Sequence, residues 1–201
     1  MNKQKGAVIV WAVLIIVILI IVGGVFYFQN TKSSVIDSSL IQIQSTDYLV
    51  SYSPTLFSEV HTNVRLPRDY TVGHQGIKLI DPKYASKIGK KECSSGEVGE
   101  VSGLMRLCTA ENQPGITFLV LSDSINNVTS VFQDFGTSDQ VIEGKTFITS
   151  SIGAEGSGVA YYFYSLSSNK TLVIVRNIVE NDTFIPSDAV FNQVISTLTV
   201  R

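Results

Sequence analysis

A long apolar run near the start of the chain constrains its architecture more than any other feature. Residues 7–28 read AVIVWAVLIIVILIIVGGVFYF and carry no charged side chain. A helix rises by about 1.5 Å per residue, so this run would reach roughly 33 Å, enough to cross a hydrocarbon core of about 30 Å. In lipid a single segment must satisfy its own backbone hydrogen bonds, which a helix does. We therefore expect a transmembrane helix over residues 7–28, preceded by a short terminal segment, residues 1–6.

The charges that flank the run predict its orientation. Lys3 and Lys5 precede it, and Lys32 is the nearest lysine after it. Positive charge favours the cytoplasmic side, so we expect a cytoplasmic N-terminus and an extracytoplasmic remainder. The predicted location is the cell membrane, crossed once, and the membrane is the first predicted partner.

Two other interpretations of this N-terminus stay open. The small residues Val22, Gly23 and Gly24 would suit a cleaved signal peptide, although the apolar run is longer than a usual one. Lys5-Gly6 before a long apolar helix would suit a pilin leader. Pilins, however, have a Glu five residues beyond the cleaved glycine, where this chain has Trp11.

The remainder of the chain has the composition of one ordinary globular domain. Residues 29–46 are rich in Ser, Gln, Asn and Thr and predict a tether with one short helical or extended stretch near residues 39–43, so the domain is expected over residues 47–201. All 17 acidic side chains follow residue 30, whereas two of the 15 basic ones precede the apolar run. The domain is thus mildly acidic and has no basic cluster, which argues against a nucleic-acid partner.

Hydrophobic periodicity predicts an α+β fold, an antiparallel sheet with flanking helices. Alternating or β-branched runs separated by short turns are typical of neighbouring antiparallel strands. Side chains spaced by three or four residues, after a capping Ser, predict helices over Asp123 to Phe135 and from Ser187 to Leu198. The strands are expected at residues 48–52, 63–66, 70–72, 77–80, 116–121, 140–143, 145–152, 159–165 and 171–178, with 101–109 weakly strand-like.

Two stretches resemble PsbP-like domains. Residues 63–72, NVRLPRDYTV, resemble the extended pair, Pro, acidic, aromatic and Val pattern of that group, and residues 191–198, FNQVISTL, resemble its C-terminal helix. Glu59-Val60-His61-Thr62 stands where that group has a turn resembling Tyr-Gly-Phe. The resemblance implies an antiparallel sheet flanked by helices and a non-enzymatic role in assembly or ligand binding. It covers little of the chain and carries over no functional residue.

Cys93 and Cys108 are the only cysteines. In an exported domain we expect them to form a disulfide, which in the chain-entropy model would contribute about 3 kcal/mol. A zinc site that combines them with His61 and His74 is the alternative. Zinc sites usually use closely spaced ligand pairs, and these four residues are far apart in the sequence. We therefore predict no metal.

The residues predict binding rather than catalysis. Residues 153–158, GAEGSG, lack the Lys-Ser/Thr of a phosphate loop, and no Ser stands in a nucleophile motif. Tyr161, Tyr162 and Tyr164 would offer an aromatic surface if one face of their strand were open. We expect a non-catalytic binding or assembly module, with a protein or cell-envelope ligand and no cofactor. The alternatives are a pilin-like filament subunit and a cell-envelope hydrolase that uses His61 or His74.

Overall fold

The computed structural model describes residues 40–67, 73–89, 109–111, 113–154, 157–179 and 187–201. All of these belong to one compact unit, Ser39–Arg201. The predicted transmembrane helix at residues 7–28, Cys93 and Cys108 lie outside the described residues. The span and the disulfide therefore stay predictions.

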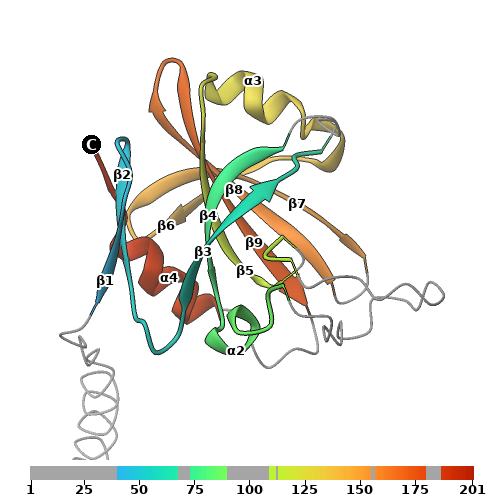
Figure 1. Ribbon diagram of the computed structural model, residues 1–201. Coiled ribbons are helices and arrows are strands. Elements are labelled where there is room, and N and C mark those ends of the chain that lie inside the picture. Colours follow the sequence, from blue (N-terminus) through green and yellow to red (C-terminus); the bar gives the residue numbers. More distant parts are fainter. Residues whose placement is uncertain (1–39, 68–72, 90–108, 112, 155–156, 180–186) are drawn as a thin grey trace, which may run out of the picture. The chain divides into compact units, whose positions relative to one another are not determined.

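Two antiparallel sheets form the described fold (Figure 1). The larger has seven strands in the order β3-β4-β5-β9-β8-β7-β6, and the smaller has three in the order β1-β2-β10. The strands are β1 (Ile41–Gln44), β2 (Tyr48–Tyr52), β3 (Ser58–Val64), β4 (His74–Ile80), β5 (Gly115–Leu121), β6 (Ser138–Ile142), β7 (Lys145–Ala154), β8 (Ser157–Ser167), β9 (Lys170–Val179) and β10 (Thr199–Val200).

The expected α+β class is wrong, because the described fold is mostly β. Its helices are short: α2 (Pro82–Ala85), α3 (Ile125–Ser130), the 3-10 turn η1 (Gln133–Phe135) and α4 (Asp188–Ser196). None of them is long and apolar enough to span a bilayer. The prediction overestimated helix because it extended one periodic run too far. It underestimated strand because several strands, among them β3 and β4, begin earlier than expected.

The helix expected over Asp123–Phe135 is interrupted. α3 ends at Ser130, Phe132 adopts φ −101° and ψ 4°, and a 3-10 turn follows. The Thr129 and Ser130 hydroxyls donate to the carbonyls of Ile125 and Asn127, at 2.8 and 2.6 Å. Such side-chain bonds compete with regular helix, and β-branched Val and Thr are weak helix formers. Apolar periodicity alone missed this break.

The strand predictions in the C-terminal half are confirmed. β7, β8 and β9 form consecutive antiparallel neighbours, as the short turns between them predicted. The β6–β7 turn is Glu143-Gly144, with φ of 49° and 74°, the two left-handed residues that a tight hairpin requires. In the N-terminal half, β3 begins at Ser58, whereas the prediction began at Asn63. The prediction missed the first residues because β3 is an edge strand with many polar side chains, so its sequence shows no clear alternation of apolar and polar residues.

Strand β1 lies within residues 29–46, the predicted tether. It pairs with β2 from Ile41↔Tyr52 to Gln44↔Leu49, and Ile43 is buried in the core. The folded part therefore begins before Asp47. Lys170 Nζ lies 2.6 Å from Asp47 Oδ1, which fastens the β1–β2 turn to the β8–β9 hairpin and, with the Thr46 hydroxyl, lowers the pKa of Asp47.

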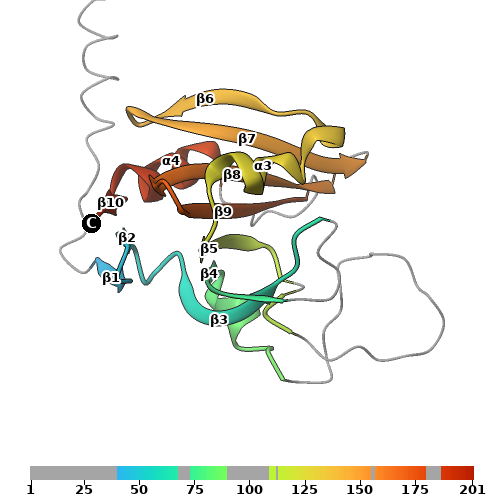
Figure 2. The same ribbon diagram turned by 90° about the horizontal axis from the view of Figure 1, so that it is seen from above.

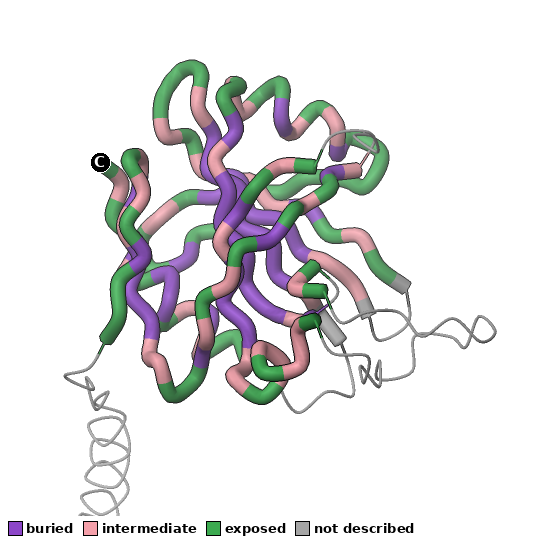
Figure 3. The backbone as a smooth tube through the Cα atoms, in the orientation of Figure 1, coloured by how far each residue is buried: buried purple, intermediate pink, exposed green. Residues whose placement is uncertain are grey.

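The large sheet is covered on both faces (Figure 2). On one face α4 and the small sheet pack over residues that include Phe118, Phe147 and Ile174. On the other, α3 and η1 pack over Leu119, Phe163 and neighbouring residues. The purple interior of Figure 3 follows the central strands, which are buried on both sides.

Phe132 is the anchor of the second face. Its fully buried ring lies 4.7 Å from the ring of Tyr161 and 4.8 Å from that of Phe163. We predict that Phe132→Ala lowers the free energy of unfolding by about 3–5 kcal/mol, because it leaves a cavity beneath α3. Phe135→Ala is the matched control, since that ring is 43% exposed. Urea denaturation followed by circular dichroism measures both, and equal losses would contradict this assignment.

Candidate functional site

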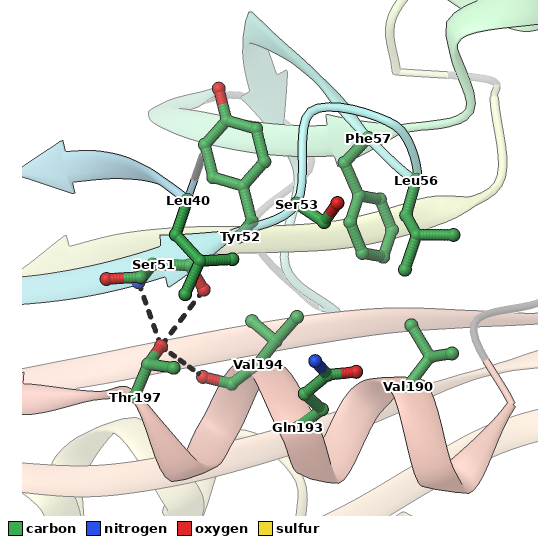
Figure 4. A pocket seen from close by; sticks show the side chains of 10 residues that line it. All are labelled: Leu40, Ser51, Tyr52, Ser53, Leu56, Phe57, Val190, Gln193, Val194 and Thr197. Atoms are coloured by element: carbon green, nitrogen blue, oxygen red, sulfur yellow. Dashed lines mark hydrogen bonds between the residues drawn. The ribbon is translucent and has the colours of Figure 1, made fainter. Parts of the chain in front are cut away.

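A small hollow lies between strand β2 and helix α4 (Figure 4). Side chains from the start of the described chain, the β2–β3 connection and α4 surround it. We call it the α4–β2 hollow. Its lining residues are Leu40, Ser51, Tyr52, Ser53, Leu56, Phe57, Val190, Gln193, Val194 and Thr197.

Helix α4 is held against the large sheet at its first turn. The Ser187 hydroxyl accepts from the Val190 N–H and caps the helix, as the sequence predicted. Arg176 Nη1 of β9 lies 2.7 Å from Asp188 Oδ1, and the Arg176 guanidinium lies 5.0 Å from the centre of the Phe191 ring. These contacts fix the helix that forms one wall of the hollow.

Thr197 joins the two walls of the hollow. Its Oγ1 accepts from the Ser51 N–H at 2.8 Å and lies 3.0 Å from the Ser51 carbonyl and 2.8 Å from the Val194 carbonyl. Figure 4 shows these bonds crossing from the end of α4 to β2. One side chain therefore satisfies buried backbone groups on both elements.

The hollow suits a single small group rather than a substrate. Its volume is about 20 Å³, room for about one water molecule. Tyr52 supplies its one titratable group, and the phenol donates to Glu59 Oε2 at 3.4 Å. Burial, with a smaller effect of the Glu59 charge, raises the pKa of Tyr52, so the phenol stays neutral at physiological pH.

Two exposed apolar side chains line the hollow, and a third follows one of them directly in the chain. Leu40 and Leu56 line the hollow and are each 37% exposed, and Ile41, next to Leu40, is 45% exposed. We call these three residues the apolar rim. A monomeric soluble domain usually scatters such side chains singly, whereas neighbouring ones mark a contact surface.

The two histidines lie on opposite faces of the large sheet. His61 stands opposite Ile77 in the β3–β4 ladder, and His74 stands opposite Val64. Side chains alternate between faces, and His74 is three residues from Ile77, so the two imidazoles point away from each other. The described residues contain no group of three potential metal ligands.

The aromatic strand does not present an open face. Tyr161, Tyr162 and Phe163 are buried, and half-buried Tyr164 lies 5.4 Å from the ring of Phe147. Tyr162 packs 4.7 Å from Phe191 of α4. The strand is thus core on both sides, and the hypothesis of an aromatic ligand surface is wrong.

A buried lysine sits on the face opposite α4. Lys78 is 3% exposed, and its Nζ donates to the Glu111 carbonyl at 3.2 Å. Burial lowers the pKa of Lys78 to about 8, an effect that the Glu111 charge opposes only in part. This bond holds the segment before β5 against the sheet.

Sequence reasoning did not find the hollow or the rim. No motif marks Leu40, Ile41 or Leu56, and an isolated leucine in a polar segment is uninformative. The available signal was the alternation in Leu40-Ile41-Gln42-Ile43-Gln44, which is typical of a strand. The short helical or extended stretch expected near residues 39–43 covers part of this strand but was assigned to the tether.

The comparisons with known proteins assign no family. No family model matches this chain, and no curated protein matches it either.

We predict that Thr197→Val lowers the free energy of unfolding by about 2 kcal/mol. The substitution keeps the shape of the side chain but leaves buried backbone groups of Ser51 without their partner. Thr199→Val on β10 is the matched control, because Thr199 is exposed. Thermal unfolding by circular dichroism separates the two, and an unchanged midpoint for Thr197→Val would disprove the role of its hydroxyl.

Because Lys78 is buried, we predict that the free energy of unfolding rises as the pH becomes alkaline. In the unfolded chain its ammonium titrates at the ordinary pKa of 10.5, whereas in the folded chain it titrates near 8. Between these values the unfolded state binds more protons, so the free energy of unfolding increases with pH, by up to roughly 3 kcal/mol.

The Lys78→Met variant lacks the titrating ammonium and therefore its pH-dependent contribution to the free energy of unfolding. The stability of the wild type relative to Lys78→Met should therefore rise as pH increases from 8 to 10.5. Urea denaturation of both proteins over this range measures the difference. Parallel pH profiles would show that the ammonium is not buried in the folded protein.

Proposed function

We propose that this protein is a membrane-anchored extracytoplasmic domain that acts as a non-catalytic binding or assembly module. A single span over residues 7–28 holds it at the membrane, and the domain contacts a protein or cell-envelope ligand. The apolar rim is the observation that carries the binding role. Its three side chains stay exposed, whereas most large apolar side chains of the described domain are buried.

The position of the rim in the chain supports the proposal. Leu40 follows the last residue of the proposed span, Phe28, by only 12 positions. A fully extended chain covers at most about 3.6 Å per residue, so the tether lets Leu40 lie no farther than roughly 43 Å from the end of the proposed span. A contact surface in this place can engage other components at the same membrane.

The chemistry around the hollow favours binding over hydrolysis. Its lining offers hydroxyl, amide and aliphatic groups, and its phenol is kept neutral. A hydrolase would bring a nucleophile to a base, and His61 and His74 stand on opposite faces of the sheet. The resemblance to PsbP-like domains points to the same kind of role, because it implies assembly or ligand binding.

Membrane integration of the full chain tests the proposal. We expect the wild type to remain in bacterial membranes after alkaline extraction, with its domain cleaved by protease added outside the cytoplasmic membrane. Leu14→Arg combined with Ile18→Arg should release the chain, because each charge at the centre of a span costs about 2.5–3.5 kcal/mol.

The matched control places the same two charges on the cytoplasmic side of the apolar run, as Asn2→Arg with Gln4→Arg. This variant should remain in the membrane like the wild type. Release of the wild type by alkali, or protection of its domain from external protease, would overturn the proposed location.

A further inference from the structure

Strand β1 forms one edge of the small sheet. In the part of the chain that the structure describes, it pairs with β2 on one side only. Figures 1 and 2 both show β1 at the outer limit of the described domain. An edge strand presents backbone N–H and C=O groups that can accept a further strand.

The register identifies the outward backbone groups. The Ser45 N–H donates to the Tyr48 carbonyl, which closes the β1–β2 turn. Hydrogen-bonded pairs alternate along an antiparallel ladder, so Ile43↔Val50 is bonded and the backbones of Gln42 and Gln44 point outward. The side chains of Gln42 and Gln44 share the exposed face, where Gln44 Nε2 lies 3.5 Å from Gln42 Oε1.

Strand β1 lacks the features that protect other edges of the described sheets. β3 carries Glu59 and His61, and β6 carries Asp139. β10 is two residues long and is followed by Arg201. Charge and short length are the usual defences against edge pairing, whereas β1 reads Ile-Gln-Ile-Gln, without charge, Pro or Gly.

We propose that β1 pairs antiparallel with β1 of a second copy of this chain. The two-fold axis passes at Ile43, so that Gln42 stands opposite Gln44 of the second copy, and Gln44 opposite its Gln42. Both residues turn their backbone groups outward, so each of these pairs exchanges two hydrogen bonds. The small sheets of the two copies thereby join into one.

The amino-acid sequence of β1 favours β1 of a second copy as the strand that pairs with its open edge. In a two-fold pair centred on Ile43, each outward residue of one copy stands opposite the other outward residue of the second copy, and Gln42 and Gln44 are both exposed amides that can donate and accept hydrogen bonds, so this edge is complementary to a copy of itself. The edge is also uncharged, so self-pairing brings no like charges together.

Membrane anchoring would promote this pairing, and this step rests on the proposed function. β1 begins at Ile41, shortly after the proposed span, so two anchored copies would present their edges at similar heights above one bilayer. Confinement to a membrane raises their effective concentration. The pairing is therefore a specific form of the assembly role proposed above.

A charge exchange tests the register directly. Gln42→Lys with Gln44→Lys places like charges opposite each other at both pairs, and Gln42→Glu with Gln44→Glu does the same with the opposite sign. Each variant alone should reduce recovery of a second, differently tagged full-length copy by at least tenfold. Co-expression of the Lys variant with the Glu variant should restore recovery to the wild-type level.

The positions chosen keep the fold intact, because both glutamines are exposed. Ser138→Lys with Gln140→Lys on β6 is the matched control, since these side chains are also exposed on an edge strand and should leave recovery unchanged. Co-purification from mild detergent and sedimentation of the full chain provide the readouts. Circular dichroism verifies that each variant is folded.

A monomeric wild type would overturn the pairing, as would a Lys variant that still dimerises or a loss that the Lys–Glu mixture fails to restore. The outcome is separable from that of the anchor. If alkali releases the chain while the charge exchange behaves as expected, the pairing stands and the proposed location fails.

Discussion

Burial of the central strands on both faces is the constraint on which the rest of this domain depends. In β9, Leu172 and Ile174 face α4 and the small sheet, while Val173 and Val175 face α3. Removing either α3 or the layer formed by α4 and the small sheet would expose apolar side chains of β9 to water. The apolar sheet therefore requires a layer on each face. The layers that pack on the two faces carry the features of functional interest.

The cover on the first face brings the candidate site together. α4 lies across the sheet because Phe191, Val194 and Ile195 are buried beneath it, and its far side then meets β2. Thr197 satisfies backbone groups of both elements at that junction. The α4–β2 hollow is the space left between a helix and a small sheet, and Leu40 and Leu56 of the apolar rim line it.

Much of the fold could be predicted from local patterns, and the site could not. The runs at β5, β7, β8 and β9 are long, β-rich and bounded by turn residues, so their chemistry determines their conformation. The cap of α4 at Ser187 was also predictable, because Ser at this position satisfies a free N–H of the first turn. Strands β1 and β3 were harder to predict from the sequence. Both are edge strands rich in polar residues, and which of their side chains are apolar depends on which face another part of the fold covers.

The amino-acid sequence by itself determined the apolar segment at residues 7–28, the acidic balance of the remainder, and the strands whose residues favour that conformation in any setting. Tertiary structure decided that β5 lies beside β9, that His61 and His74 face apart, and that Leu40 and Leu56 line the same hollow. The physical reason is the distance along the chain over which each effect acts. Propensity, capping and turn chemistry act over a few neighbouring residues, whereas strand order and site geometry depend on which distant surfaces best exclude water together.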